Sequence, residues 1–467
     1  MSNTPTALAV PHVLGRGLEV PVVGGGTVRY ADLDNAASTP PLVGVWESVE
    51  AFMPWYASVH RGDGYKSQVA TAAYESARQA VRAFVNAGRD DAVVITRNTT
   101  DAVNLLARCL PSGTTVLTTS AEHHANMLAW RRYADVVELP VPASREEALQ
   151  RAESALRARP VARPVLLAVT GASNVTGEVW PVAEMATLAR RYGARVFIDA
   201  AQLAPHRPVD MAGWGLDWVA FSGHKLYAPF GAGALVGRSD WLAGAEPYLF
   251  GGGAVDEVTV SGATWADMPA RHEGGSPNVV GAVALAAACT ILSQVGMGHL
   301  AEEDRRLAGF LQSTLETVPG ITVYRTWRDA TDRVALATFN LRQHDHPTVA
   351  AVLSAEHGIG VRSGSFCAHP LLMHLVGPAG EGQAGCGQRV PGAVRASLGL
   401  GSSREDVDRL GDALRGLVRR GPRWAYEPLA DGTMVPAPDD RQWLANPWDQ
   451  ATPQINASRP AALGMLL

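Results

Sequence analysis

Between about residues 65 and 240, short apolar runs alternate with amphipathic stretches. The runs are uninterrupted and rich in β-branched residues, which is typical of strands buried on both faces. The predicted strands are 92–96, 115–119, 165–169, 195–199, 218–222 and 233–237. Helical spacing of apolar residues predicts helices over 68–87, 100–110, 125–133 and 182–192. This alternation predicts an α/β fold with a mostly parallel sheet covered by helices.

The pattern changes after an Ala-rich predicted helix at 279–295. Predicted helices over 301–317, 347–356 and 404–419 and a strand over 334–341 suggest a smaller α+β domain. We therefore expect four parts: an irregular N-terminal segment (1–30) that packs on the small domain, a large domain (31–298), a small domain (299–420) and an extension (421–467). The extension holds seven prolines and three tryptophans and is expected to lack regular structure. The Gly-rich stretch 376–393 is expected to be an exposed loop.

Composition narrows the class of protein. The chain has 467 residues, of which 47% are apolar and 18% charged, and its net charge is -5. A sizeable core is possible, disorder is not expected, and nothing favours a nucleic-acid or membrane partner. Neither a run of about 20 apolar residues nor a signal peptide is visible. The four cysteines lack CxxC spacing, so neither a disulfide framework nor a metal site is expected, and a reducing cytoplasm is the default compartment.

Lysine is almost absent. Of the 40 basic residues only Lys66 and Lys225 are lysines, and the other 38 are arginines. A primary amine can act as a nucleophile, whereas a guanidinium keeps its proton. A remaining lysine is therefore a candidate for amine chemistry, although Lys66 has the ordinary explanation of a solvated surface residue.

Polar residues follow two neighbouring predicted strands. Asp199 closes one strand, and Ser222-Gly-His-Lys225 follows the next. Ligands of α/β sheets bind at the carboxyl ends of strands. Pyridoxal phosphate needs a lysine for its Schiff base and an acid beside its pyridine nitrogen, and Ser222 is placed to bind the phosphate. The alternative interpretation is that Asp199 and Lys225 form an ion pair without a cofactor.

Other segments add weaker signals. Thr99 and Thr100 are candidate caps at a predicted helix start, where backbone N–H groups attract anions. His123 follows a strand and is suited to stack on a flat ring. Cys367 lies among small and polar residues and is either an exposed nucleophile or an inert half-buried thiol. Arg395 either clamps a carboxylate or is one surface arginine among many.

Together these residues resemble the class V aminotransferase family of pyridoxal-phosphate enzymes, and within it the cysteine desulfurase and selenocysteine lyase branch. The resemblance runs from Leu33 to about Leu410, in family order. The matching motifs are Leu33-Asp-Asn-Ala-Ala-Ser38, Val59-His-Arg-Gly62, Thr99-Thr-Asp101, Glu122-His-His-Ala-Asn126, Ala172-Ser-Asn174, Asp199-Ala-Ala-Gln202, Ser222-Gly-His-Lys225, Glu273-Gly-Gly-Ser-Pro-Asn278, Arg362-Ser-Gly364, Cys367-Ala368 and Arg395-Ala-Ser397. The family's fold is type I, with a large domain around a seven-stranded, mostly parallel sheet and a smaller α+β domain.

The resemblance also implies a cofactor site. Lys225 would hold pyridoxal phosphate and shuttle a proton, and Asp199 would pair with its ring nitrogen. The other implied cofactor-binding residues are Thr99, Thr100, His123 (which stacks on the ring and assists proton transfer), Asn174, Gln202, Ser222, His224 and Ser276. Because Ser276 would reach the phosphate of a neighbouring subunit, the resemblance implies a homodimer with shared active sites.

For the substrate, the resemblance implies that Asn174, Arg362 and Arg395 bind a small amino acid. Cys367 would attack the sulfur of L-cysteine, which leaves L-alanine and a persulfide that a sulfur-acceptor protein could take over. Three features depart from the branch: Ser365-Phe366 replaces the histidine that many members carry beside this cysteine, the loop 376–393 is long, and the extension has no counterpart. Another reaction that does not use Cys367, namely an aminotransferase, β-lyase or epimerase reaction, therefore stays open, as do the exact substrate, cysteine or selenocysteine preference, and the acceptor.

Overall fold

The computed structural model describes residues 10–159, 163–377 and 391–443. Its centre is a seven-stranded sheet with the strand order β4-β10-β9-β8-β7-β5-β6. Only β10 runs antiparallel to its neighbours, and the other pairs are parallel. The strands are β4 (Ala92–Thr96), β5 (Thr115–Thr119), β6 (Asp135–Leu139), β7 (Val165–Thr170), β8 (Arg195–Asp199), β9 (Trp218–Ser222) and β10 (Gly233–Gly237). The predicted α/β class with a mostly parallel sheet is confirmed, and β6 is a strand that the pattern did not predict.

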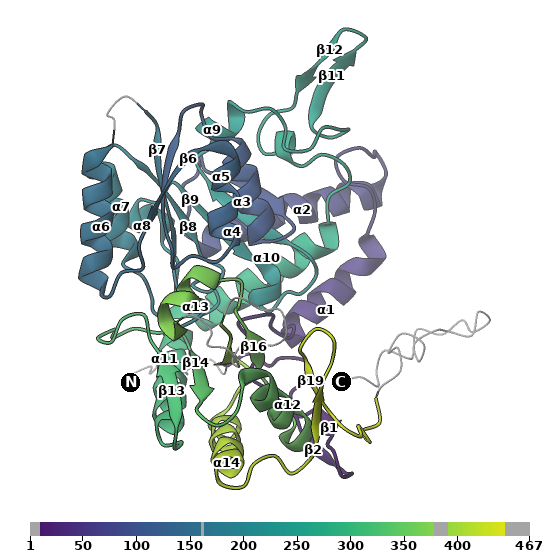
Figure 1. Cartoon of the computed structure of the whole chain (residues 1–467). Coiled ribbons are helices and arrows are strands. Elements are labelled where there is room, and N and C mark those ends of the chain that lie inside the picture. Colours follow the sequence, from purple (N-terminus) through teal and green to yellow (C-terminus); the bar gives the residue numbers. More distant parts are fainter. Residues whose placement is uncertain (1–9, 160–162, 378–390, 444–467) are drawn as a thin grey trace, which may run out of the picture.

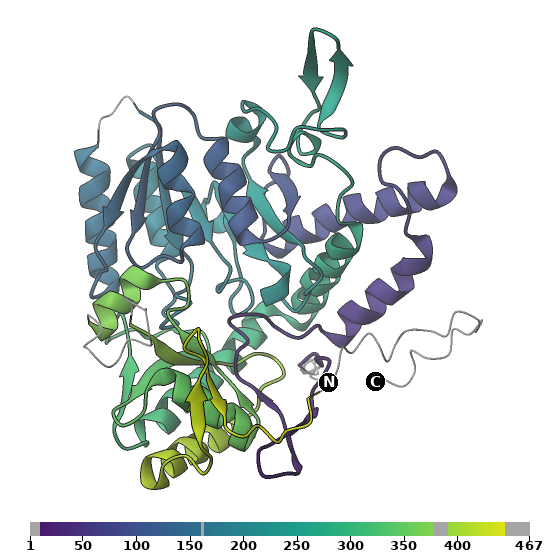
Figure 2. The same cartoon turned by 45° about the vertical axis from the view of Figure 1, so that its right-hand side comes forward.

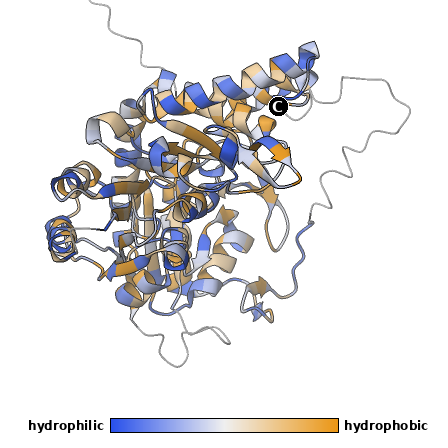
Figure 3. Cartoon of the chain, turned by 90° about the horizontal axis from the view of Figure 1, so that it is seen from above, coloured by the Kyte–Doolittle hydropathy of each residue, from blue (hydrophilic) through white to orange (hydrophobic). Residues whose placement is uncertain are grey.

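Helices cover both faces of this sheet (Figure 1). Successive residues of β8 point to opposite sides, so Val196 and Ile198 belong to one core cluster and Phe197 to another. The first cluster is closed by α1 (Val43–Phe52), α2 (Tyr65–Phe84), α6 (Arg145–Ala158), α7 (Val182–Arg191) and α10 (Val279–Val295), and the second by α3 (Thr99–Arg108), α5 (Trp130–Tyr133) and α9 (Ser239–Ala243). Figure 3 shows the same distribution, with hydrophobic strands inside and polar residues on the outer helix faces.

Several helix boundaries differ from the prediction. The side chain of Asn98, rather than Thr99 or Thr100, caps α3 by accepting a hydrogen bond from the Asp101 N–H. Asparagine is as good a cap as threonine, and the sequence alone did not separate three adjacent capping residues. The predicted helix 125–133 is divided into α4 (Ala125–Leu128) and α5. The helix predicted over 68–87 spans Tyr65–Phe84.

A second sheet lies below the first in Figure 1. It is antiparallel, with the strand order β13-β14-β17-β16. Its strands are β13 (Ile321–Tyr324), β14 (Leu336–Leu341), β16 (Arg362–Gly364) and β17 (Ala393–Ser397), and it is accompanied by α11 (Met297–Glu316), α12 (His346–His357), α13 (His369–Val376) and α14 (Arg404–Arg420). The core of this part is a separate cluster that contains Leu311, Phe339 and Leu410.

Both ends of the described chain add short strands. β1 (Glu19–Pro21) and β2 (Thr27–Arg29) form a hairpin, and β3 (Ala31–Asp32) pairs with β15 (Ile359–Gly360). β18 (Tyr426–Pro428) and β19 (Met434–Pro436) form another hairpin. The expectations of an irregular N-terminal segment and a non-regular extension are therefore wrong at these residues. In the first hairpin, Gly24, Gly25 and Gly26 all have positive φ and make the turn.

The remaining elements are short or project from the body. β11 (Val255–Thr259) and β12 (Gly262–Trp265) form a hairpin that extends away from the sheet (Figures 1 and 2). The others are α4, α8 (Met211–Trp214), η1 (Met53–Trp55), η2 (Gly223–Lys225) and η3 (Ala270–His272). Residues 378–390 of the Gly-rich stretch lie outside the described part of the chain. The proposed limits of the domains stay predictions.

No single helix of the described ranges is both long and apolar enough to cross a membrane. α10 and α11 pass such a test only when they are taken together, and they are bent by 83°.

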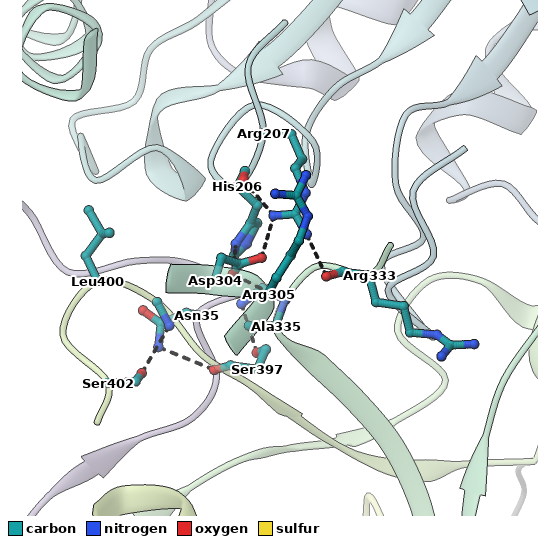
Figure 4. Close-up of polar contacts among 12 residues, drawn as sticks. Asn35, His206, Arg207, Asp304, Arg305, Arg333, Ala335, Ser397, Leu400 and Ser402 are labelled. Carbon is teal, nitrogen blue, oxygen red and sulfur yellow. Dashed lines mark hydrogen bonds and ion pairs between the residues drawn. The ribbon is translucent and has the colours of Figure 1, made fainter. Parts of the chain in front are cut away.

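A buried ionic cluster joins the two sheets (Figure 4). Asp304 on α11 accepts a hydrogen bond from Arg207 Nη1 at 2.6 Å and lies 2.7 Å from Nδ1 of His206. Arg207 Nη2 also donates to the Arg333 carbonyl at 2.7 Å, just before β14. The segment that follows β8 is thereby attached to the helix and strand of the second sheet, which fixes how that sheet covers the carboxyl ends of the first.

Candidate active site

A cavity of about 270 Å³ lies between the two sheets, at the carboxyl ends of β8 and β9. Twelve of the thirteen residues that the sequence assigns to a site line it. They are Thr99, Thr100, His123, Asn174, Asp199, Gln202, Ser222, His224, Lys225, Arg362, Cys367 and Arg395. The exception is Ser276, which is exposed in the loop before α10 and does not line the cavity.

Hydroxyl and backbone donors gather at one end of the cavity. Ser222 Oγ accepts the Thr99 N–H at 2.8 Å and lies 2.8 Å from Thr99 Oγ1. Thr100 follows in the first turn of α3, where the helix dipole favours an anion. Gly223 permits this arrangement, because a Cβ there would lie 2.6 Å from the Ala232 carbonyl. This end of the cavity is suited to a phosphate.

Asp199 and Lys225 occupy the middle of the cavity. Asp199 is buried, and its Oδ1 accepts the Ala201 N–H at 2.9 Å. Burial raises the pKa of Asp199, while this hydrogen bond and the charge of Lys225 act in the opposite direction. Burial also lowers the pKa of Lys225 to about 8, against the attraction of Asp199. The ionised form of a buried carboxylate is stabilised by a nearby cation, such as a protonated ring nitrogen.

His123 supplies a flat, neutral ring. Its Nδ1 accepts the Ala125 N–H at 3.1 Å. Burial, together with the charge of Lys225, lowers the pKa of His123 to about 3. Glu122 ties the two sides of this segment together, because it accepts hydrogen bonds from Thr119 Oγ1 and Asn126 Nδ2 at 2.9 and 2.8 Å. A neutral imidazole at the cavity wall suits stacking on an aromatic ligand.

Arg395 lies at the other end, with only 3% of its surface exposed. Its Nη1 donates to the Asn174 carbonyl at 2.9 Å and its Nη2 to Asp34 Oδ1 at 3.4 Å. Within the described part of the chain its Nε has no hydrogen-bond partner. Burial lowers the pKa of Arg395 to about 10, although Asp34 favours its charge. A buried guanidinium with an unpaired donor is suited to a substrate carboxylate.

Asp34 and Phe366 belong to the site, but no role was predicted for them from the sequence. Asp34 lies 3.6 Å from Arg362 and so pairs with both arginines of this end. The guanidinium of Arg395 lies 5.0 Å from the centre of the Phe366 ring. The motif Leu33-Asp-Asn was visible in the sequence, but nothing in it indicated a contact with residues more than 300 positions away.

Cys367 is exposed at the mouth of the cavity. Its carbonyl accepts the His124 N–H at 2.8 Å, and Asn174 Nδ2 donates to the Phe366 carbonyl at 2.8 Å. Phe366 and Cys367 both have φ of 53°, in the left-handed region that residues with a Cβ adopt at a cost. Two hydrogen bonds thus hold the cysteine in a strained turn beside Lys225 and Arg395.

The sequence of residues 31–410 matches the family model named Aminotransferase class-V. The chain belongs to this family. Its relatives include a probable cysteine desulfurase of Halalkalibacterium halodurans, 34% identical over 403 residues (84% of this chain and 93% of the relative), and a cysteine desulfurase of Klebsiella pneumoniae, 36% identical over 397 residues (83% and 93%).

Solved structures agree with this assignment. The apo cysteine desulfurase of Thermococcus onnurineus is 30% identical, with a TM-score of 0.74. A cysteine desulfurase of Escherichia coli, solved in an S-sulfonic acid form, is 33% identical, with a TM-score of 0.72. Each comparison covers 84% of this chain and 95% of the other. The chain is therefore a class-V pyridoxal-phosphate enzyme of fold type I.

The donor set fits this cofactor. A phosphate matches the Thr99, Thr100 and Ser222 end, a ring nitrogen matches Asp199, and the aldehyde carbon matches the Lys225 amine. Gln202 lines the same cavity and donates from Nε2 to the Ala36 carbonyl at 2.7 Å, which leaves its Oε1 and second N–H for a ligand.

The lowered pKa of Lys225 predicts the pH dependence of cofactor loading. Only the neutral amine attacks an aldehyde, so the loading rate of cofactor-free protein should rise with pH, reach half of its maximum near pH 8 and level off above that pH. Near pH 8, the neutral fraction should be on the order of a hundred times that of an ordinary lysine. The visible absorbance of bound cofactor after mixing measures the rate, and N-acetyl-lysine in place of the protein corrects for titration of the aldehyde. A rate that keeps rising to about pH 10, the range of an ordinary lysine, would contradict this.

Proposed function

We propose that this enzyme is a cysteine desulfurase that converts L-cysteine to L-alanine and leaves the sulfur on Cys367. The observation that carries the proposal is the position of Cys367, an exposed thiol at the mouth of the cavity that also contains Lys225, Asp199 and Arg395. The relatives described above, which bear the name cysteine desulfurase, support it.

The site's own residues provide the binding steps. Arg395 and Arg362 hold the substrate carboxylate, and Asn174 fixes the turn before Cys367 through the Phe366 carbonyl. Thr99, Thr100, Ser222 and His224 hold the phosphate of the cofactor, and Asp199 holds its ring nitrogen. Held there, pyridoxal phosphate would supply an aldehyde for the amine of Lys225 and an electron sink for the substrate Cα. The neutral ring of His123 stacks on it.

Two residues act on the substrate. The Lys225 Nζ would remove the proton from the substrate Cα and later return a proton. The Cys367 thiolate attacks the substrate sulfur, so a new S–S bond forms while the substrate Cβ–S bond breaks. Cβ keeps the electron pair and takes a proton. Free cysteine and the Cys367 thiol thus give alanine and a Cys367 persulfide, with no outside oxidant.

Turnover with L-cysteine tests the proposal. In the presence of dithiothreitol, the persulfide is reduced and sulfide is released, so alanine and sulfide should form in equal amounts. Both products are measured in the same samples, with D-cysteine as the control substrate. Failure to form alanine from a protein that has bound pyridoxal phosphate would contradict the proposal.

We also infer a homodimer with shared active sites. Ser276 is exposed outside its own cavity, as expected of a residue that binds the phosphate of a partner subunit. Large apolar side chains are exposed at η1 and the start of α2 (Trp55 44%, Tyr56 49%, Tyr65 72%) and at the tip of the β11–β12 hairpin, where Val260 is fully exposed. Such patches mark protein interfaces.

Sedimentation equilibrium at micromolar protein tests the dimer. A mass of twice 49.4 kDa is expected, and Tyr65→Asp should shift the protein toward the monomer, whereas Ser154→Asp on the exposed face of α6 should not. A monomer in the unchanged protein would contradict the inference.

Because Cys367 has to stay reduced between turnovers, we place the enzyme in the cytoplasm.

A further inference from the structure

The C-terminal extension is attached to α12 by a buried carboxylate. Glu356, 5% exposed, accepts the backbone N–H groups of Arg423 and Trp424 at 2.9 and 3.2 Å. Arg423 Nε also donates to its other oxygen at 2.9 Å. Because one carboxylate has three donors from the first residues of the extension, the β18–β19 hairpin that follows is fixed beside α12.

The hairpin closes a groove of about 550 Å³. Residues 431–436 form one wall and α12 forms the floor. The other wall consists of β16 and the residue before it (361–364). Arg362 lines both this groove and the active-site cavity. Cys367 follows the groove wall by only three residues. The groove and the site that contains Cys367 are thus neighbours, with Arg362 in the wall of both.

The walls suit an extended polypeptide. Among the described residues, β16 pairs only with β17 and β19 only with β18, so each has one edge without a strand partner. A peptide in the extended conformation can pair with such an edge. The groove lining combines small or apolar side chains with polar ones. The apolar group includes Ala350, Ala351, Val361, Met434, Val435 and Pro436, and the uncharged polar group includes Ser354, Ser363 and Thr433.

Both arginines that line the groove are paired with carboxylates. Arg441 donates to Asp439 at 2.8 Å and stacks over the Trp443 ring at 4.7 Å. At the other end, Arg362 lies 3.6 Å from Asp34. Apolar side chains beside paired arginines favour an uncharged extended segment over a charged small molecule.

The hairpin wall lies outside the part of the chain that the family shares. The family match ends at residue 410. The alignments with the two relatives include 83 to 84% of this chain and 93% of each relative. One wall of the groove is therefore built by a segment beyond the match, whereas α12 and β16 lie within it.

We propose that this groove binds an extended, apolar segment of the protein that accepts sulfur from Cys367. The inference rests on the proposed function. The acceptor's thiolate attacks the outer sulfur of the Cys367 persulfide, a new S–S bond forms on the acceptor, and the old S–S bond breaks to release the Cys367 thiolate. One thiolate is consumed and one is formed, so no oxidant or reductant is needed.

Peptide thiols test the groove. The holoenzyme is first loaded with L-cysteine without reductant, and alanine formation and the mass of one added sulfur on Cys367 are checked. The loaded enzyme is then mixed with blocked Val-Thr-Val-Ser-Gly-Cys, with the reversed peptide Cys-Gly-Ser-Val-Thr-Val, or with N-acetylcysteine amide at equal concentration. Mass spectrometry follows the persulfide on each acceptor. One of the two peptides should be sulfurated at least about tenfold faster than N-acetylcysteine amide. A tenfold ratio corresponds to about 1.4 kcal/mol of additional binding free energy.

Two groove variants complete the test. Ala351→Arg on α12 and Val435→Arg on β19 both fill the groove and should remove the peptide's advantage, while Ser154→Arg on α6 should keep it. All three should form alanine with dithiothreitol at the unchanged rate, which shows that they are folded. Equal rates for peptides and N-acetylcysteine amide, or an advantage that survives both groove variants, would overturn the inference. Failure to load Cys367 at all would instead overturn the proposed function, and this inference with it.

Discussion

Lys225→Ala should abolish turnover of L-cysteine, with a loss of about 10⁴-fold or more, because the variant lacks both the amine that holds the cofactor and the base that moves the Cα proton. Alanine and sulfide assays at saturating L-cysteine measure the loss. The cavity has no second amine to replace it: the chain's other lysine, Lys66, is exposed at the start of α2 and does not line the cavity.

The scarcity of lysine provides an unusually clean control. Lys66→Ala removes the same side chain from the same protein and should leave kcat and KM unchanged. Borohydride treatment of the holoenzyme should attach the cofactor to the peptide that contains Lys225 and never to the one that contains Lys66. Substantial turnover by Lys225→Ala, or label on Lys66, would exclude the assigned role of Lys225.

Cys367→Ala has the second largest expected effect, and it should separate two steps. Sulfide release and alanine formation should fall by on the order of 10⁴-fold or more, as when a nucleophile is removed. The cofactor spectrum and its change on addition of L-cysteine should stay, because Cys367 is at the mouth of the cavity and Lys225, Asp199 and Arg395 are untouched.

The matched control for this cysteine lies in the same turn. Ser365→Ala changes a side chain two residues away and should keep nearly full activity, which shows that the turn tolerates a small change. If Cys367→Ala still formed alanine at the unchanged rate, the thiol would have no part in the chemistry, and a β-lyase or aminotransferase reaction of the same family would describe the enzyme better.

Part of the site could be predicted from residues that follow predicted strands, and the rest is what the resemblance to the family implies. Asp199 and Ser222 end short apolar runs, and parallel neighbouring strands bring their carboxyl ends together. The composition singles out Lys225 as well, because only two of the 40 basic residues are lysines. The roles of individual residues remain predictions until they are tested, but the structure places twelve of the thirteen around one cavity.

What the sequence could not predict depends on contacts between distant residues. The bond from Arg395 to Asp34 joins positions 361 apart, and neither neighbourhood has a local pattern that reveals it. The antiparallel direction of β10 is a property of its pairing with β4 and β9, and its apolar composition does not reveal it. The β18–β19 hairpin has three-residue strands among prolines, too short for a period-two pattern to be recognised.

The intact mass of the enzyme after a single turnover tests the central claim most directly. Holoenzyme is mixed with one equivalent of L-cysteine without reductant, and the alanine released and the mass of the chain are measured together. The account predicts one alanine for each added sulfur atom, with that sulfur located on the peptide of Cys367 and absent in Cys367→Ala. Alanine without added sulfur, or sulfur on another cysteine, would contradict it.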